Sequence, residues 1–332
     1  MGRGRAAGRV PRVSGWLSVA EYADEWRRLG DGDPYYRPEF LAAAALAEDA
    51  EPAVFSHDGV LHPFLVRSLP DGRCDLTSAY GFAGPSAAGD WRAAFRAACS
   101  ERGVVSEFIR FHPVRQNQRF AGDDVALTQV QEMIVLDLDG DDDELVRRMV
   151  PQARNKLRKA IRRGVTVSAS RDLERFWGLY SDAMRGLGAA GGYLFPLAYF
   201  EALDALGDGL LMLDAGSAAA LFLCGAGAMH YFLSASTDEG RRSAATNLVI
   251  YEAMRIARDS GLAVLNLGGG LREGDALHGF KCSFGPGRAP YYVGSAIHDQ
   301  AAYRRLSERA GVDPGDAYFP AYRRPAAVAA DG

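Results

Sequence analysis

The order of the secondary structure is decided between residues 210 and 267. Residues 210–236 read LLMLDAGSAAALFLCGAGAMHYFLSAS, residues 247–259 read NLVIYEAMRIARD, and residues 263–267 read AVLNL. The first stretch holds three apolar runs separated by the glycine-containing turns 214–216 and 225–227, which predicts three short antiparallel strands. The second stretch has helical periodicity, and the third is a short apolar run typical of a buried strand. The predicted order is therefore three strands, a helix and a further strand.

The first half of the chain repeats this order more faintly. Residues 52–56 and 60–67 flank the turn His57-Asp58-Gly59 and predict a hairpin. A loop at 78–85, a helix at 91–102, a strand at 105–112 and a closing strand at 132–138 follow. We therefore predict an α/β (α+β) chain with two tandem domains, each a mixed, mostly antiparallel sheet flanked by helices. The expected boundaries are a disordered tail at 1–15, domains at 16–145 and 146–300, and a C-terminal helix and tail at 301–332 that packs back on the first domain.

Composition places the chain among globular proteins of ordinary size. Its 332 residues suffice for two cores, and 48% are hydrophobic while 24% are charged. The four cysteines are scattered and form no zinc or redox motif, as is typical of a reduced, cytoplasmic protein. Residues 1–15 lack the apolar segment of a secretory signal, and the apolar stretch 209–228 is interrupted by Asp214 and by glycines. We expect a cytoplasmic monomer with no membrane insertion.

A strongly basic helix begins the second half. Residues 154–163 read RNKLRKAIRR and carry six positive charges, which the net charge of −4 conceals because the preceding acidic linker 137–144 carries six acids. Pro151 opens the helix and Gly164 ends it. On a helical wheel Leu157, Ala160 and Ile161 form an apolar stripe.

The wheel divides the cations of this helix into two groups. Arg154 and Arg158 border the stripe and are expected to hold phosphate in a cleft, because a guanidinium fork suits phosphate oxygens. Lys156, Lys159 and Arg163 point away, towards solvent or a passing polyanion. A plain solvated face is the alternative for the whole cluster. Asn155 is either a backbone partner or a substrate contact.

Six segments together resemble a known family. They are DLTSAYGFAGP (75–85), FIRFHP (108–113), RNKLRKAIRRGV (154–165), HYFLSAS (230–236), LNLGGG (265–270) and GFKCSFG (279–285). In this order they resemble the Fem family of aminoacyl transferases (FemA, FemB, FemX), which form amide bonds from aminoacyl-tRNA. The resemblance implies a tandem pair of Gcn5-related N-acetyltransferase (GNAT) folds with a substrate channel. It also implies aminoacyl-tRNA as co-substrate with no other cofactor, and an amine acceptor on a small molecule or peptide precursor of antibiotic or cell-wall biosynthesis.

The resemblance also assigns a site. The family places a functional Phe-Lys pair at Phe280 and Lys281, in a loop after the glycine run. Transfer of an aminoacyl ester to an amine passes through an oxyanion, which a fixed ammonium group stabilises. A surface lysine beside a core phenylalanine is the alternative. His230 is a candidate general base, although a lone strand histidine is more often structural.

Other candidate residues are expected to contact substrate. Arg110 and His112 share one face of a strand and form a candidate polar pair. Tyr35, Tyr36 and Tyr80 line an acceptor pocket or are simply packed. The resembling segments add Ser234, Asn266 and Gly268.

The sequence also bears on competing functions. A coenzyme A-dependent enzyme of this fold binds pyrophosphate on a glycine-rich loop before the central helix. Here residues 240–247 read GRRSAATN, with alanine where that glycine is needed, which weakens coenzyme A binding. No Gly-x-Ser-x-Gly elbow and no histidine spacing of a metal site is present. We expect an aminoacyl-tRNA-dependent aminoacyltransferase; an acyl-CoA-dependent N-acyltransferase and a non-catalytic tRNA-binding module are the alternatives.

Overall fold

The strands form one continuous sheet. A computed structural model describes residues 14–188 and 191–325, and in them twelve strands run in the order β1-β2-β3-β4-β5-β12-β6-β11-β10-β9-β8-β7. The strands are β1 Gly15–Leu17, β2 Glu51–His57, β3 Val60–Ser68, β4 Cys74–Thr77, β5 Val104–Arg110, β6 Ala126–Asp137, β7 Ser168–Ser170, β8 Leu210–Asp214, β9 Ala218–Gly225, β10 Ala228–Ser236, β11 Val264–Gly268 and β12 Arg288–Ile297. The helices are α1 Val19–Leu29, α2 Pro38–Glu48, α3 Arg92–Arg102, α4 Asp142–Arg148, α5 Pro151–Arg162, α6 Leu173–Gly186, α7 Leu197–Leu203, α8 Asp238–Ser243, α9 Ala245–Asp259, α10 Ala276–Cys282 and α11 Gln300–Arg309. The expected disordered tail, 1–15, lies outside the described residues except for its last two, and Gly15 already belongs to β1.

The chain repeats one strand-helix-strand order twice, as predicted. In the N-terminal half β2, β3 and β4 are antiparallel, and β5 follows α3 and pairs parallel to β4. In the C-terminal half β8, β9 and β10 are antiparallel, and β11 follows α9 and pairs parallel to β10. All other strand pairs of the described residues are antiparallel. The predicted fold class, a mixed and mostly antiparallel sheet flanked by helices, is confirmed.

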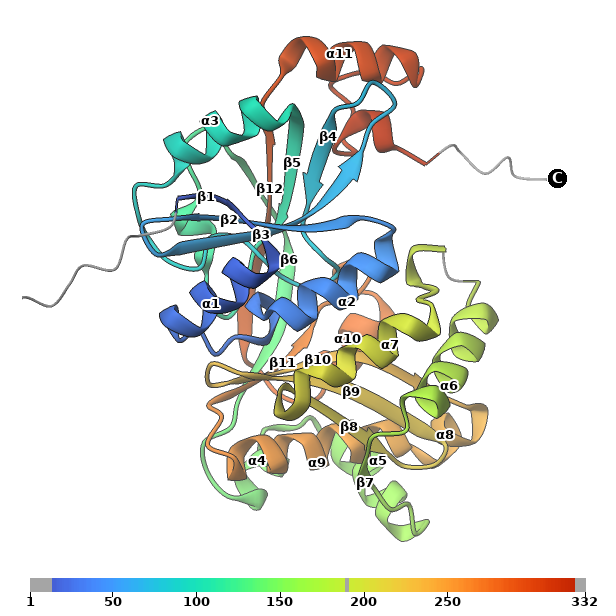
Figure 1. Ribbon diagram of the computed structural model, residues 1–332. Helices are drawn as coiled ribbons and strands as arrows, with labels where there is room; N and C mark the ends of the chain where they lie inside the picture. The colour runs from blue at the N-terminus through green and yellow to red at the C-terminus, as the bar shows by residue number, and fades with distance from the viewer. Residues whose placement is uncertain (1–13, 189–190, 326–332) are drawn as a thin grey trace, which may run out of the picture.

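Two long strands join the halves. β6 follows the first half in sequence but pairs with β11 at residues 134–137 and with β12 at residues 126–134. β12 follows the second half but pairs with β5. Figure 1 shows these strands running between the upper and the lower half of the molecule. Each half therefore donates its last strand to the middle of a shared sheet.

Helices cover both faces of the sheet. In the C-terminal half α4, α5 and α9 pack on one face, where Leu145, Leu157 and Met254 share a buried cluster. The other face lies under α6 and α7, and α7 contacts α2 of the first half (Figure 1). Phe40 of α2 and Phe200 of α7 belong to one buried cluster that spans both halves. This common core fixes the two halves relative to each other.

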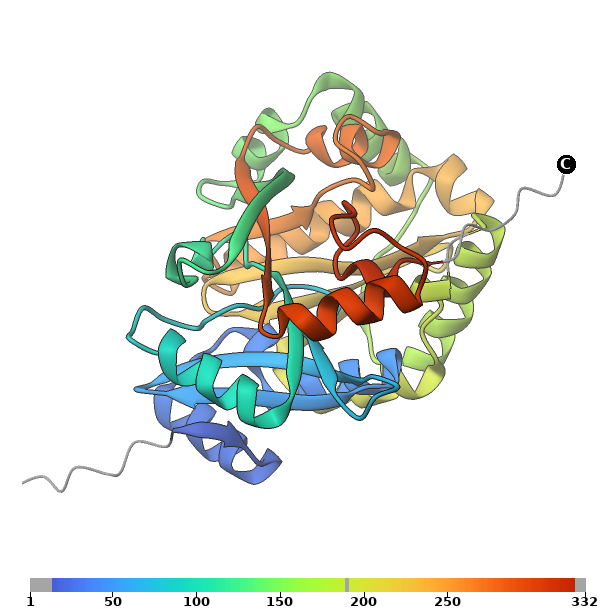
Figure 2. The same ribbon diagram turned by 90° about the horizontal axis from the view of Figure 1, so that it is seen from above.

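The C-terminal segment closes over the first half. Figure 2 shows α11 lying across the strands of that half. Tyr303 of α11 and Ala321 share a buried cluster with Val105 of β5. Arg323 donates a hydrogen bond from Nε to Asp75 Oδ2, at 2.9 Å, and Arg67 donates to the other oxygen of that carboxylate, at 2.6 Å.

Two predictions of local structure were wrong. The expected acidic linker contains α4, because Asp141 caps the helix by accepting from the Glu144 backbone N–H at 2.8 Å and its first-turn acids suit the positive end of the helix dipole. Phe280 and Lys281 lie on α10 rather than in a loop. Asp275 caps that helix by accepting from the His278 N–H at 2.7 Å. An aspartate directly before a helix is a capping signal that can be read from the sequence. No described helix has the length and apolar character needed to cross a bilayer.

Candidate functional site

A gap between β10 and β11 creates a cavity in the C-terminal half. The two strands pair only where residues 228–230 face residues 264–266, and β10 then continues to Ser236 while β11 ends at Gly268. The cavity beside the free part of β10 has a volume of about 500 Å³. Its walls come from α5, α6, β10, the α8–α9 turn and α10: Lys156, Ala183, Met184, Leu187, Tyr231, Ser234, Ala235, Ser236, Gly240, Arg241, Ala244, Thr246, Asn247, Leu277 and Phe280. We call it the C-terminal cavity.

Lys281 does not itself line this cavity, but it directly follows Phe280, which does. The Lys281 side chain is 8% exposed, and Nζ donates a hydrogen bond to the Gly269 carbonyl oxygen at 2.7 Å. Nζ is also 5.7 Å from the ring centroid of Tyr231, which lines the cavity. Burial lowers the Lys281 pKa to about 8, and Asp275 opposes that shift. An ammonium group has three protons, so two remain for a substrate oxygen.

The glycine run before α10 makes room for this amine. Gly268 has φ of 74°, in the left-handed region, and a Cβ there would lie 3.3 Å from Lys281 Nζ. Its N–H donates to Asn266 Oδ1 at 2.8 Å. The expected substrate contacts Asn266 and Gly268 therefore shape the turn that presents the Gly269 carbonyl to Lys281.

His230 is buried inside the sheet and is not among the residues that line the C-terminal cavity. Its Nδ1 lies 3.2 Å from Asn266 Nδ2, which donates because Asn266 Oδ1 already accepts from Gly268. Burial, together with neighbouring His112, lowers the His230 pKa to about 3. The neutral His230 ring accepts a hydrogen bond from Asn266 and so orders the end of β11. His230, the expected general base, is thus buried away from solvent and from the cavity.

Phe280 and Ser234 both line the C-terminal cavity, as a substrate-binding role requires. Phe280 also lines a smaller cavity of about 210 Å³ between α5 and α10. Lys156 lines both cavities. The side chain that joins the basic helix to the site is thus Lys156.

The expected orientation of α5 was wrong. Ile161, placed in the apolar stripe, is 55% exposed, and the buried stripe is Ala153, Leu157 and Ala160. When Ala153 is counted in the stripe in place of Ile161, the centre of the stripe moves by roughly 25° around the helix towards Lys156, at about 100° per residue. Arg158 is consequently exposed, and its guanidinium bonds Asn155 Oδ1 at 3.3 Å on the outer face.

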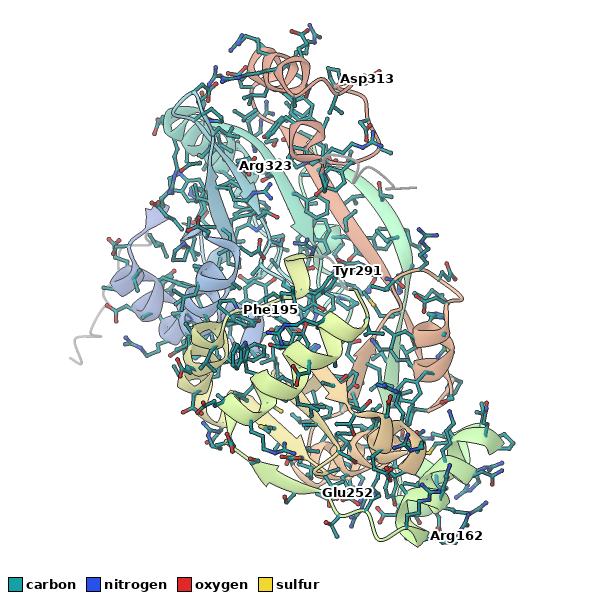
Figure 3. All side chains as sticks on the ribbon, turned by 90° about the vertical axis from the view of Figure 1, so that its right-hand side faces the viewer. Arg162, Phe195, Glu252, Tyr291, Asp313 and Arg323 are labelled. Carbon is teal, nitrogen blue, oxygen red and sulfur yellow. The ribbon has the colours of Figure 1, made fainter. Side chains whose placement is uncertain are left out.

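The cations of α5 have no acidic partners. Within the described residues no carboxylate lies within 4.0 Å of the charged groups of this helix, which are Arg154, Lys156, Arg158, Lys159, Arg162 and Arg163. Elsewhere arginines commonly pair, as Arg148 does with Asp139 at 2.7 Å. Figure 3 shows Arg162 at the lower end of the molecule. The helix therefore carries six cations without carboxylate partners among the described residues, and one of them, Lys156, lines the C-terminal cavity.

The expected pair of Arg110 and His112 is separated. His112 is buried between the halves, with Nε2 3.1 Å from Asp33 Oδ2 and its ring centroid 5.0 Å from that of His230. Burial alone would raise the Asp33 pKa, but His112 holds it well below its usual value. β5 ends at Arg110 and the turn 113–116 follows directly after His112, so the period-two rule of a strand no longer applies to His112.

The three candidate tyrosines lie in packed surroundings. Tyr36 is fully buried, and its hydroxyl donates to the Gly84 carbonyl at 3.0 Å while it accepts from Asn117. Tyr35 packs edge-on against His230, with 5.1 Å between ring centroids. Tyr80 packs against Phe232 and Phe195, and burial raises its pKa to about 12.

A second cavity lies over the N-terminal half, and Arg110 opens into it. Its volume is about 520 Å³, and its floor is one face of β4, β5, β12 and β6. The segment 317–320 forms one wall. The lining residues are Arg67, Thr77, Phe108, Arg110, Ala126, Thr128, Val130, Tyr291, Val293, Ser295, Ala317, Tyr318, Phe319 and Pro320. We call it the N-terminal cavity; Figure 3 labels Tyr291 near the middle of the molecule.

Gln131 connects a residue of the N-terminal cavity to the glycine run beside Lys281, although it lines neither cavity itself. Tyr291 of the N-terminal cavity pairs with Gln131 across β12 and β6. Gln131 Nε2 donates to the Gly270 carbonyl at 3.2 Å, next to the Gly269 carbonyl that holds Lys281. No sequence pattern pointed to Gln131, because its contact with Gly270 depends on the pairing of β6 with strands of the other half. Among the described residues no group of three or more His, Cys, Asp and Glu side chains is arranged to hold a metal.

Comparisons with known proteins bear on the fold. No protein-family model and no curated protein matches the sequence. Among solved structures the chain is similar to FemX, with a TM-score of 0.62 and 17% identity over 87% of this chain and 98% of that one. It is also similar to L-PGS from Bacillus licheniformis, with a TM-score of 0.55 and 14% identity over 86% of this chain and 94% of that one. A third structure is the C-terminal domain of a protein named as a lysylphosphatidylglycerol synthetase, from Agrobacterium fabrum, with a TM-score of 0.56 and 15% identity over 89% and 96%. The chain therefore has a Fem-like GNAT fold, with its two halves built into one sheet.

Proposed function

We propose that this protein is an acyltransferase that moves an amino acid from aminoacyl-tRNA to the amine of a small molecule or peptide precursor. The observation that carries the proposal is the position of Lys281, a buried amine that lies 5.7 Å from the ring centroid of Tyr231. Tyr231 lines the C-terminal cavity together with Lys156 of the basic helix. The similarity to FemX and to L-PGS supports it. The cytoplasm, where charged tRNA occurs, is the proposed compartment.

The basic helix suits the tRNA backbone. Exposed, unpaired cations bind phosphates without sequence preference and with strong salt dependence. Lys156 continues this surface into the C-terminal cavity, where the aminoacyl end of the tRNA would enter. Leu277 and Phe280 give the cavity an apolar wall for the amino acid side chain.

The chemistry is a direct transfer. The acceptor amine attacks the ester carbonyl carbon, the carbonyl oxygen becomes an oxyanion, and the C–O bond to the ribose then breaks. Lys281 Nζ stabilises the oxyanion with its free protons, held in place by its bond to the Gly269 carbonyl. The residues that line the cavity include no carboxylate and no imidazole. The amine proton therefore passes to the departing ribose oxygen through the substrates, and catalysis rests on positioning and charge.

An acyl-CoA-dependent N-acyltransferase is the second candidate, because the amino terminus of α9 opens into the same cavity through Ala244, Thr246 and Asn247. Backbone N–H groups at a helix terminus attract pyrophosphate. Two features disfavour coenzyme A binding. α8 ends directly before α9, so no glycine-rich loop precedes the amino terminus of α9. The joining residue Ala244 adopts a left-handed φ of 62°, a conformation that favours glycine.

The test is a transfer assay with mass-spectrometric detection. Purified protein is incubated with tRNA charged with each amino acid in turn and with a panel of amines, with acyl-CoA donors in parallel. Product that forms from charged tRNA and disappears after ribonuclease treatment supports the proposal. Product from acyl-CoA alone supports the second candidate. Binding of tRNA with no product from any donor, unchanged in Lys281→Met, would identify a non-catalytic tRNA-binding module instead.

A further inference from the structure

The N-terminal cavity contains a cation without a counter-ion. Arg110 donates from Nη1 to the Ser78 carbonyl oxygen at 2.7 Å, and its guanidinium lies 5.2 Å from the ring centroid of Phe108. No carboxylate of the described residues lies within 4.0 Å of it. Its remaining N–H groups have no partner in this part of the chain. A half-buried guanidinium that is fixed by one hydrogen bond can offer its remaining N–H donors to a ligand.

A second guanidinium lines the same cavity. Arg67 is oriented by its bond to Asp75, but Asp75 is fully buried and is shared with Arg323. The other acid nearby is Glu48, which accepts from the Tyr80 N–H and is not among the lining residues. Burial raises the Glu48 pKa, against the effect of Arg110 and Arg67. Three guanidinium groups thus face two carboxylates, and neither carboxylate lines the cavity.

The rest of the cavity suits a small polar molecule. Cross-strand register places Phe108, Ser295 and Ala126 in one row of the floor, and Arg110, Val293 and Thr128 in the next. The small side chains of Ala126, Thr128 and Ser295 leave space above the sheet, while Tyr291 and Phe319 form aromatic walls. A volume of about 520 Å³ is that of a small-molecule site.

We propose that the N-terminal cavity is an anion-binding site that holds a carboxylate or phosphate of the acceptor, with Arg110 and Arg67 as its ligands. That the bound molecule is the acceptor rests on the proposed function. Tyr291, Gln131 and the Gly269–Gly270 carbonyls connect this cavity to Lys281. The acceptor therefore lies with its anion on Arg110 and its amine towards Gln131, and the substrate class is an amine that carries an acidic group.

The experiment compares matched probes by isothermal titration calorimetry on the full chain. Glycyl-L-tyrosine is compared with its C-terminal amide, and O-phosphoethanolamine with ethanolamine. Wild-type protein is expected to prefer one anionic probe over its neutral partner by at least about tenfold, the range of a charge-assisted hydrogen bond. The preferred pair tells whether the anion is a carboxylate or a phosphate. Equal affinities within both pairs would overturn the inference.

A matched variant tests the assignment to Arg110. In Arg110→Gln the preference for the anionic probe is expected to fall to about twofold or less. Arg119→Gln is the control, because Arg119 is exposed, lies 4.8 Å from the Phe120 ring centroid, has no carboxylate partner among the described residues and does not line the cavity. A preference that survives in Arg110→Gln would exclude Arg110 as ligand.

The transfer assay separates the two proposals. Arg110-dependent binding of an anionic probe, with no tRNA-dependent product from any acceptor, would leave the anion site standing and remove the proposed function. If product forms equally well with anionic and neutral amines, and Arg110→Gln does not change it, the proposed function stands and the anion site is removed.

Discussion

The two halves repeat one fold, but their cavities are built differently. In the C-terminal half β10 outruns its parallel partner β11, and the cavity is a gap within the sheet. In the N-terminal half β4 ends at Thr77, where its pairing with β5 ends, and β12 and β6 continue the sheet beyond β5. The N-terminal cavity is therefore a hollow on an intact sheet face. The ends of two strands thus make one cavity a gap within the sheet and the other a hollow on its face.

The largest effect is expected from Lys281→Met. If the C-terminal cavity performs the chemistry, kcat falls by roughly 100- to 1,000-fold, the usual effect of removing an oxyanion donor. The KM for charged tRNA stays within about twofold. Steady-state transfer kinetics measure both, and Lys281→Arg restores part of kcat because it keeps the charge. An unchanged kcat in Lys281→Met would remove the catalytic role of this half.

Filling each cavity in turn should separate the two substrates. Ser234→Trp occupies the C-terminal cavity and is expected to raise the KM for aminoacyl-tRNA by about tenfold or more, with a smaller effect on the acceptor. Thr128→Trp occupies the N-terminal cavity and is expected to do the opposite. Thermal melting confirms that both variants fold. The same KM pattern in both variants would mean that the cavities are not divided between two substrates.

The pH dependence follows from the Lys281 pKa of about 8. The ammonium form is the active one, so kcat is expected to fall about tenfold per pH unit above pH 8. This fall is absent in Lys281→Arg, whose charge persists. In the folded chain the group loses its proton at a lower pH than its ordinary value of 10.5, so the free energy of unfolding rises with pH between about 8 and 10.5. Rate profiles and melting curves over that window check both signs.

The smallest effect concerns the rim of the C-terminal cavity. Lys156→Ala is expected to lower kcat/KM for charged tRNA several-fold, because Lys156 lines the cavity. Arg158→Ala and Arg154→Ala are expected to weaken tRNA binding in a salt-dependent way, and each lost phosphate contact lowers the slope of log affinity against log salt by about one. Filter binding at several salt concentrations measures this slope. Wild-type affinity and slope in all three variants would remove the basic helix from tRNA binding.

Local patterns predicted most of the elements. The helix predicted at 91–102 is found as α3, Arg92–Arg102, because its amphipathic period and the glycine that ends it are both local signals. The hairpin at the His57-Asp58-Gly59 turn and the three strands after residue 210 were also readable. Helices α4 and α10 were missed although their capping aspartates stand in the sequence. A charged run was interpreted as a linker and a glycine run as the start of a loop.

The site was predictable only in part. The resemblance pointed to Phe280, which lines the C-terminal cavity, and to Lys281, which follows it and bonds the Gly269 carbonyl, but their site roles stay predictions. Arg110 and His112 were paired by strand alternation, which fails where β5 ends. Lys156 is exposed, as the wheel predicted, but the wheel gave no sign that it also lines two cavities. The wheel omitted Ala153 from the buried stripe, and an alanine shows its burial only once α5 packs on α9.

By itself the sequence determined the repeated order of strands and helices, the basic helix opened by Pro151, and the lysine that follows Phe280. These features depend on neighbours within about one turn of helix or one strand. Only the tertiary structure decided that β6 and β12 exchange places, that β10 extends beyond β11, and that Lys281 and Gln131 both donate to carbonyls of the glycine run. The strand exchange and the Gln131 contact depend on pairing between segments more than a hundred residues apart, which no local pattern specifies.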